Sequence, residues 1–174
     1  MKRINFGNFA LQKILNPPDV LTFLNLVCGF TSILLSIGGK HAEAVSVLLL
    51  AVVFDYFDGK TARIMQRKTD FGREMDSLAD LISFGLAPAI HGYMLLPFNL
   101  FTIIALVFFV TCGMVRLARY NVMHYDSGFM GMPITTNGIL FPILYSVPFL
   151  HTFYLFFFIL SGIFMVAPIK VRRI

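Results

Sequence analysis

The sequence predicts an all-α integral membrane protein with six transmembrane helices and a short interfacial helix at the N-terminus. Two features of the composition indicate this class: 57% of the 174 residues are hydrophobic and 13% are charged, whereas about a quarter of the residues in a soluble domain are charged. The third observation is that six apolar stretches can be drawn, each near the roughly 20 residues that a bilayer core requires. Because backbone polar groups must be satisfied internally in lipid, these stretches are expected to be helices.

The chain reads as a single domain over residues 1–174, because no linker, repeat or low-complexity segment divides it. Residues 1–16 are expected to form the interfacial helix, in which Phe6, Phe9 and other apolar side chains touch lipid. Polar residues interrupt this segment, which argues against a cleavable signal peptide. Pro17 is expected to break the interfacial helix before the first span. The six helices are predicted at about residues 20–37, 42–65, 72–96, 100–120, 133–149 and 153–170.

Each predicted helix is built on one apolar run. The runs, in chain order, are Val20–Ile37, Ala42–Phe57, Leu78–Leu96, Leu100–Leu117, Pro133–Phe149 and Phe153–Ile169. The second and third helices are expected to continue past the membrane edge as polar helix, the second beyond Phe57 and the third before Leu78. These two extensions follow one another in the sequence, and the most informative residues lie on them.

The basic residues predict how the chain crosses the membrane. Six spans put both termini on one side, and most basic residues lie at span ends on that same side, whereas Lys40 is expected on the other side. The positive-inside rule therefore places both termini and the acidic segment described next in the cytoplasm, in a multi-pass protein of the cell membrane. The net charge of +5 is better explained by anionic lipid headgroups than by nucleic acid.

Four carboxylates lie at the ends of two hydrophobic spans: Asp55 and Asp58 after the second apolar run, and Asp76 and Asp80 before or within the third. Acids in such places are costly unless they are paired, hydrated or bound to cations. On a helix, Asp55 and Asp58 share one face, and so do Asp76 and Asp80. Two helices joined by a short basic loop can turn these faces toward each other. Converging carboxylates make an oxygen-rich site for Mg²⁺ or Mn²⁺.

Small and basic residues accompany the acids. Gly59, Ala62 and Gly72 lie on the same helix faces and leave room for a bulky polar ligand. Arg63 supplies a fixed positive fork that suits phosphate. Acids, a metal, an arginine and small residues together suit a diphosphate substrate. The plainer interpretation is a structural salt-bridge network, which leaves the small residues unexplained.

This segment resembles the CDP-alcohol phosphatidyltransferase family, whose motif is D-x2-D-G-x2-A-R-x8-G-x3-D-x3-D. The chain matches the motif without departure at Asp55, Asp58, Gly59, Ala62, Arg63, Gly72, Asp76 and Asp80. Shorter matches, at residues 18–26, 116–121 and 129–133, resemble the phosphatidylserine synthase branch. Together these segments extend the resemblance over most of the chain.

The resemblance implies a phospholipid-biosynthetic transferase. A phosphatidyl group, or its ether-lipid equivalent, would pass from CDP-diacylglycerol or CDP-archaeol in the membrane to the hydroxyl of an alcohol, with release of CMP. The branch implies L-serine as that alcohol, which makes the protein a phosphatidylserine synthase in expectation. The family also implies a homodimer.

The resemblance and the chemistry of the side chains together assign expected roles. The ligands of Mg²⁺ or Mn²⁺ are expected to be Asp55, Asp58, Asp76 and Asp80. Asp80, the last acid of the motif and the one nearest the membrane interior, is also expected to be the catalytic base. The CDP-lipid is expected to contact Asp55, Asp58, Gly59, Ala62, Arg63, Gly72, Asp76, Thr22 and Asn25. The acceptor is expected to contact Ser83, Arg116, Arg119 and Asn121.

Alternatives stay open for several of these roles. Arg116 and Arg119 can instead reach lipid headgroups as anchors, while Thr22 and Asn25 can hydrogen-bond between helices. His91, deep in the third span, has no evident partner and is expected to be structural. Glycerol phosphate or inositol phosphate is the alternative acceptor, because it too needs basic residues. A divalent-cation transporter is the alternative from another class, although spans four to six carry no acid that would continue an ion path.

Overall fold

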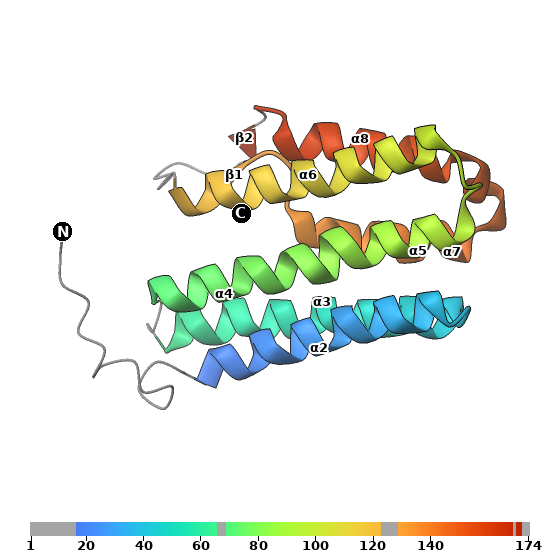
Figure 1. Ribbon diagram of the computed structural model, residues 1–174. Helices are drawn as coiled ribbons and strands as arrows, with labels where there is room; N and C mark the ends of the chain where they lie inside the picture. Colours follow the sequence, from blue (N-terminus) through green and yellow to red (C-terminus); the bar gives the residue numbers. More distant parts are fainter. Residues whose placement is uncertain (1–16, 66–68, 123–128, 169, 172–174) are drawn as a thin grey trace.

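The structure, a computed structural model, describes residues 17–65, 69–122, 129–168 and 170–171. Over these residues the chain forms a bundle of six helical segments (Figure 1). The α-helices are α2 (Pro17–Ile37), α3 (His41–Ile64), α4 (Asp70–Asp80), α5 (Ala87–Leu95), α6 (Leu100–Val122), α7 (Asn137–Ser146) and α8 (Tyr154–Val166). A π-helical segment, η2 (Leu81–Leu86), joins α4 to α5 into one continuous helix. Short 3₁₀ segments precede α7 and α8, namely η3 (Ile134–Thr136) and η4 (Pro148–Phe153).

The helices form two groups on either side of the continuous α4–η2–α5 helix. Helices α2 and α3 pack against each other along one side of the bundle, and α6 packs against α8 on the other (Figure 1). The β structure within the described residues is a two-residue antiparallel strand pair, β1 (Phe129–Met130) with β2 (Lys170–Val171). It lies at the end of the bundle where α4 begins and α6 ends.

The first two helices keep close to the apolar runs that predict them. Helix α2 begins at Pro17, earlier than the expected residue 20, because a proline at the first helical position loses no hydrogen bond. Helix α3 runs without a break from His41 through the apolar run and on past Asp58. The interfacial helix expected over residues 1–16 lies outside the described residues.

The long third helix begins at a side-chain cap and widens at its middle. The Thr69 hydroxyl accepts a hydrogen bond from the Gly72 amide at 2.9 Å, which caps the N-terminus of α4. Pro88 has no N–H to donate to the carbonyl of Phe84, so the regular α-helical pattern cannot continue there. The π-helical segment Leu81–Leu86 accommodates this defect and starts directly after Asp80.

Four of the helical segments are long and apolar enough to cross a membrane: Asp19–Ile37, Asp70–Leu95, Leu100–Val122 and Pro148–Val166. Helix α3 is of sufficient length but carries Glu43, Asp55, Asp58, Lys60 and Arg63. The α-helical part of the expected span 133–149 is shorter than expected, because α7 has 10 residues and is bounded by a 3₁₀ turn and Pro148. A helical integral membrane protein is therefore what the structure supports, whereas six full crossings stay a prediction.

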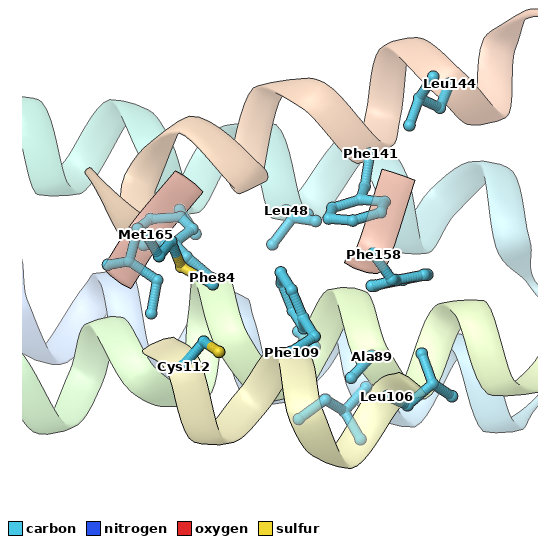
Figure 2. Packing of buried hydrophobic residues seen from close by; sticks show 14 of the residues in the cluster. Leu48, Phe84, Ala89, Leu106, Phe109, Cys112, Phe141, Leu144, Phe158 and Met165 are labelled. Carbon is cyan, nitrogen blue, oxygen red and sulfur yellow. The ribbon is translucent and has the colours of Figure 1, made fainter. Parts of the chain in front are cut away.

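Aromatic packing holds the second half of the bundle together. Phe141 of α7 stacks on Phe158 of α8 with ring centroids 4.1 Å apart, and Phe109 of α6 meets both rings edge-on (Figure 2). All three side chains are buried. A Cβ on Gly92 of α5 would lie 2.5 Å from the Phe158 ring, so glycine lets α5 approach this cluster. Close packing of this kind is what associates helices in lipid, where the hydrophobic effect between helices is absent.

A second close approach positions the candidate site. A Cβ on Gly29 of α2 would lie 2.6 Å from the Cα of Ser83, so only glycine allows α2 to cross η2 at this distance. The Ser83 hydroxyl donates to the Asn25 carbonyl across the same contact at 3.1 Å. This crossing brings the N-terminal part of α2 alongside the motif helices α3 and α4.

Candidate functional site

Three aspartates from two helices converge in the half of the bundle where α4 begins. Asp55 of α3 and Asp76 and Asp80 of α4 each place one carboxylate oxygen within 4.8 Å of the others. Asp80 is buried, with 6% of its surface exposed, and the other two are half-buried. The two acidic helix faces therefore meet, as the spacing of the motif predicts. We refer to Asp55, Asp76 and Asp80 as the acid cluster.

No basic side chain neutralises the acid cluster directly within the described part of the chain. Among the described residues, the ion pair with a distance of 4.0 Å or less joins Arg73 to Asp70, at the exposed start of α4 and outside the acid cluster. Three carboxylates held this close repel one another unless a cation or protons compensate them. Hard oxygen ligands in this arrangement fit a divalent cation such as Mg²⁺ or Mn²⁺. The buried aspartate group is thus consistent with a metal site.

Asp58 lies one turn after Asp55 on α3 and outside the acid cluster as defined above. Its carboxylate is buried and accepts a hydrogen bond from the hydroxyl of Thr22 on α2. The structure therefore places Thr22 beside the motif, where its hydroxyl makes a hydrogen bond between helices. Asp58 contributes negative charge beside the acid cluster while one of its oxygens is used by α2.

Asn25 of α2 reaches the last acid of the motif. Its side-chain Nδ2 donates to Asp80 Oδ1 at 3.1 Å, and the Asn25 side chain is completely buried. The Asn25 Oδ1 atom has no hydrogen-bond partner among the described residues. Asn25 therefore orients the Asp80 carboxylate and leaves one acceptor oxygen at the site without a partner in the part of the chain that the structure describes.

Arg116 and Arg119 lie one turn apart on α6 but have different surroundings. The buried Arg116 guanidinium interacts electrostatically with Asp55, Asp76 and Asp80 from beyond ion-pair distance. Arg119 donates to the carbonyls of Val166 at 3.1 Å and Met165 at 3.4 Å, which are orphan acceptors at the end of α8. Of these two arginines, Arg116 is the one whose charge faces the acid cluster.

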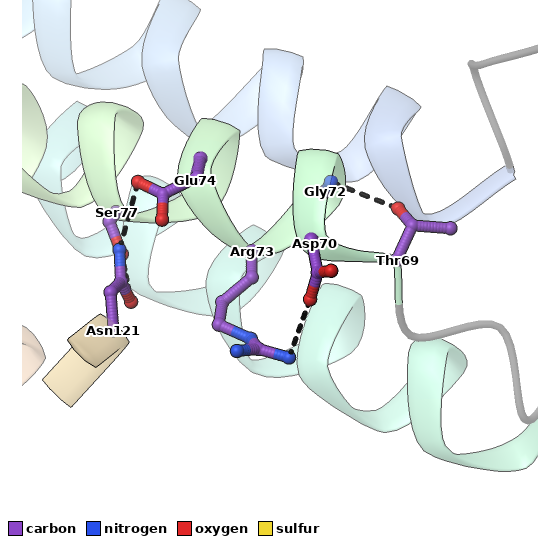
Figure 3. A network of polar contacts seen from close by, with 7 residues as sticks. All are labelled: Thr69, Asp70, Gly72, Arg73, Glu74, Ser77 and Asn121. Atoms are coloured by element: carbon purple, nitrogen blue, oxygen red, sulfur yellow. Dashed lines mark hydrogen bonds and ion pairs between the residues drawn. The ribbon is translucent and has the colours of Figure 1, made fainter. Parts of the chain in front are cut away.

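Asn121 connects the end of α6 to α4. Its Nδ2 donates to Glu74 Oε2 at 3.1 Å, and its Oδ1 accepts from the Ser77 hydroxyl at 3.2 Å (Figure 3). Both amide atoms are thus used between helices. Ser83 is likewise engaged through its hydrogen bond to the Asn25 carbonyl, and its side chain is buried.

The two motif glycines have different environments. A Cβ on Gly59 of α3 would meet nothing within 4 Å, which is open space beside Asp58. A Cβ on Gly72 of α4 would lie 3.0 Å from the Thr69 hydroxyl and 3.1 Å from the Asp19 carboxylate. Gly59 therefore leaves room for a ligand, while Gly72 lets α4 approach α2. Ala62 lies one turn after Gly59 on α3 and is half-buried. The exposed Arg63 donates through Nε to the Gly59 carbonyl at 2.9 Å.

Thr135 is a site residue that the sequence analysis does not identify. It lies on η3, and its side chain interacts with the Asp55 carboxylate. Gly131, which has a φ of +77°, makes the turn that leads into this segment. Residues 129–133, which resemble the phosphatidylserine synthase branch, end two positions before Thr135. Their closeness in sequence is the signal that could have pointed to Thr135.

Comparisons with known proteins agree with the motif. The family model described as CDP-alcohol phosphatidyltransferase matches residues 15–169. A CDP-diacylglycerol–serine O-phosphatidyltransferase of Methanocaldococcus jannaschii is 37% identical over 132 residues, 76% of this chain and 61% of that protein. An archaetidylserine synthase of Methanothermobacter thermautotrophicus is 38% identical over 162 residues, 90% of this chain and 70% of that protein. A CDP-diacylglycerol–serine O-phosphatidyltransferase of Bacillus subtilis is 34% identical over 130 residues, 73% of each chain.

Proposed function

The chain belongs to the CDP-alcohol phosphatidyltransferase family, and on that premise we propose that it transfers a phosphatidyl or archaetidyl group from a CDP-linked lipid to the hydroxyl of L-serine, releasing CMP. The observation that carries the reaction type is the acid cluster at the end of an apolar helix bundle. Serine as the acceptor is supported by the names of the relatives, each matched over 73% or more of this chain.

The test of this proposal is a purified-protein assay with a panel of acceptors. CDP-diacylglycerol and CDP-archaeol are each supplied with serine, glycerol phosphate or inositol phosphate, and CMP release is measured. We expect serine to give the fastest release. Faster release with glycerol phosphate would move the protein to another branch of the family, and metal flux into liposomes without CMP release would favour a transporter.

The residues of the acid cluster would hold the metal, with Asp58 beside them. When bound, Mg²⁺ or Mn²⁺ would neutralise the diphosphate and stabilise the charge that develops on the leaving CMP. The cytidine diphosphate would lie against Gly59 and Ala62, where the helix surface is open or lightly covered. Arg63 is exposed next to this surface and suits a phosphate oxygen. Thr22, Asn25 and Gly72 support the same surface by holding α2 against α3 and α4.

The size of the side chain at position 59 is expected to control binding of the CDP-lipid. Gly59→Leu should raise the KM for CDP-lipid by about tenfold or more, because the new side chain fills the open space while the serine site is untouched. Gly59→Ala is the matched variant, and it should be folded and at least as stable because alanine favours the helix. Unchanged KM values in Gly59→Leu would show that the nucleotide lies elsewhere.

We place the acceptor carboxylate at Arg116. Ser83, Arg119 and Asn121 are the other acceptor residues expected from the sequence, and each already makes hydrogen bonds between helices. Arg116 is buried, faces the acid cluster and is outside ion-pair distance of it, so its charge is available to a bound carboxylate. The serine hydroxyl would then lie near Asp80, and the unpartnered Asn25 Oδ1 would accept from its ammonium group.

Replacing Arg116 is expected to affect serine more than the lipid. Arg116→Ala should raise the KM for serine by about 10–100-fold, the effect of losing one charge-assisted hydrogen bond. Serine methyl ester should be a poor substrate of the unmodified protein. Arg119→Ala is the matched variant, which should lower thermal stability by uncapping α8 and leave the KM for serine nearly unchanged. If Arg116→Ala raised the KM for serine and the KM for CDP-lipid equally, the role of Arg116 would be in folding.

We further propose that all six helices cross the membrane, with the termini and the acid cluster on the cytoplasmic side. Single cysteines at Lys40 and Lys60 test this, in a background in which Cys28 and Cys112 are replaced. Both lysines are exposed; Lys40 precedes the start of α3 and Lys60 lies near its end. An impermeant thiol reagent should label position 40 from outside and position 60 from the cytoplasm, and the reverse pattern would invert the orientation. The homodimer implied by the family is part of the same proposal, testable by the mass of the detergent-solubilised protein.

A further inference from the structure

A second polar cluster lies at the end of the bundle opposite the acid cluster. His41 is the first residue of α3, His91 lies at the middle of α5, and Ser36 lies near the end of α2. At 1.5 Å per residue, about 21 Å of helix α3 separates His41 from Asp55. The histidines therefore do not belong to the site described above, and the proposed reaction does not use them.

Two ring nitrogens in this cluster are buried without partners. His91 is 3% exposed, and its Nδ1 lies 3.1 Å from the Ser36 hydroxyl oxygen. His91 Nε2 and His41 Nδ1 are both buried, and within the described part of the chain neither has a hydrogen-bond partner. Leaving a buried polar atom unsatisfied is destabilising, because the atom loses its water without gaining a partner. Two such nitrogens on neighbouring rings are therefore better explained by a shared ligand than by packing alone.

The spacing of the two rings fits a metal ion. The ring centroids of His41 and His91 are 5.3 Å apart and the ring planes are 83° apart. With Zn–N bonds of about 2.0–2.1 Å in tetrahedral geometry, two imidazole ligands have centroids about 5 Å apart. The Ser36 hydroxyl can accept from His91 Nδ1–H, which leaves the Nε2 lone pair available, and metal-binding histidines are commonly oriented by such a partner.

The geometry points to a site for a divalent transition-metal ion, with Zn²⁺ as the best fit, held by His41 Nδ1 and His91 Nε2 and completed by water. Tyr145 covers the pair, with its ring centroid 5.2 Å from that of His91. Neighbouring His151 is exposed and directs its Nε2 to the Tyr145 carbonyl at 2.8 Å, so it is not needed as a ligand. Imidazole ligands suit Zn²⁺, whereas carboxylates suit Mg²⁺ and Mn²⁺. The protein would therefore bind one kind of metal at the histidine cluster and another at the acid cluster.

The test uses Co²⁺ as a spectroscopic substitute for Zn²⁺ in the full-length protein. In the triple variant Asp55→Asn, Asp76→Asn, Asp80→Asn the acid cluster is removed, and Co²⁺ should still bind one per chain with the intense visible absorption of tetrahedral coordination. Zn²⁺ should displace it and Mg²⁺ should not. The same titration on the unmodified protein in excess Mg²⁺ provides an independent measurement if the triple variant does not fold.

Variants of the histidine cluster separate this site from other binding. His41→Gln, at a half-buried helix start, should weaken Co²⁺ binding at least tenfold, and Ser36→Ala should weaken it by about 10–100-fold. His151→Gln is the matched control and should leave Co²⁺ binding unchanged. CMP release with Mg²⁺ should be unaffected in His41→Gln, so failure of this site would not bear on the proposed reaction. Octahedral Co²⁺ alone, or unchanged affinity in His41→Gln, would overturn the proposal.

Discussion

Asp80→Asn is expected to lower turnover by about 10²–10⁴-fold, the range that follows loss of a general base, while CDP-lipid and metal still bind. Asparagine keeps the size and polarity of the side chain but cannot take the proton of the attacking hydroxyl. Asp80 suits this role because it is the buried member of the acid cluster and is oriented by Asn25 at 3.1 Å. The measurements are single-turnover CMP release and equilibrium binding of the CDP-lipid.

Asp76→Asn provides the comparison. Asp76 lies next to Asp55 in the acid cluster and is half-buried, so we assign it mainly to the metal. Its replacement should weaken metal-dependent nucleotide binding, with turnover recovering in part at high metal concentration. Asp70→Asn is the matched control, because Asp70 is an exposed acid on the same helix and pairs with Arg73. If Asp80→Asn loses CDP-lipid binding as fully as Asp76→Asn, then Asp80 serves only as a metal ligand and the base lies elsewhere.

Excess chelator is expected to reduce CMP release to background, and added Mg²⁺ or Mn²⁺ to restore it. The acid cluster brings three carboxylate oxygens within 4.8 Å of one another without an ion pair to a basic residue in the described part of the chain. A diphosphate adds further negative charge, so it should bind poorly unless a divalent cation is present. CMP release is measured after dialysis against EDTA and again after each metal is returned.

The identity of the metal that restores CMP release distinguishes the acid cluster from the histidine cluster. Mg²⁺ alone should restore activity, because carboxylates and not imidazoles prefer it. Full CMP release in excess EDTA would contradict the metal site at the acid cluster. A requirement for Zn²⁺ together with Mg²⁺ would show that the histidine cluster contributes to the fold that the reaction needs.

The sequence by itself determined the helical class and which motif acids share one helix face. Apolar runs of near membrane length can satisfy their backbone only as helices. The spacing of Asp76 and Asp80 places both on one helix face whatever the helix packs against. These features are local, since they depend on residues within a few turns of each other. The family motif is local in the same sense, which is why it was recognisable along the chain.

The tertiary structure alone decided which helix completes the site. Asn25 and Asp80 are far apart in the chain, and their contact depends on Gly29 allowing α2 to cross η2 beside Ser83. It also decided that Arg116 faces the acid cluster while Arg119 caps α8. The pattern of residues along one helix cannot specify such choices, because they depend on the packing distance and rotation between helices. For the same reason the paired nitrogens of the histidine cluster became visible only when α3 and α5 were placed side by side.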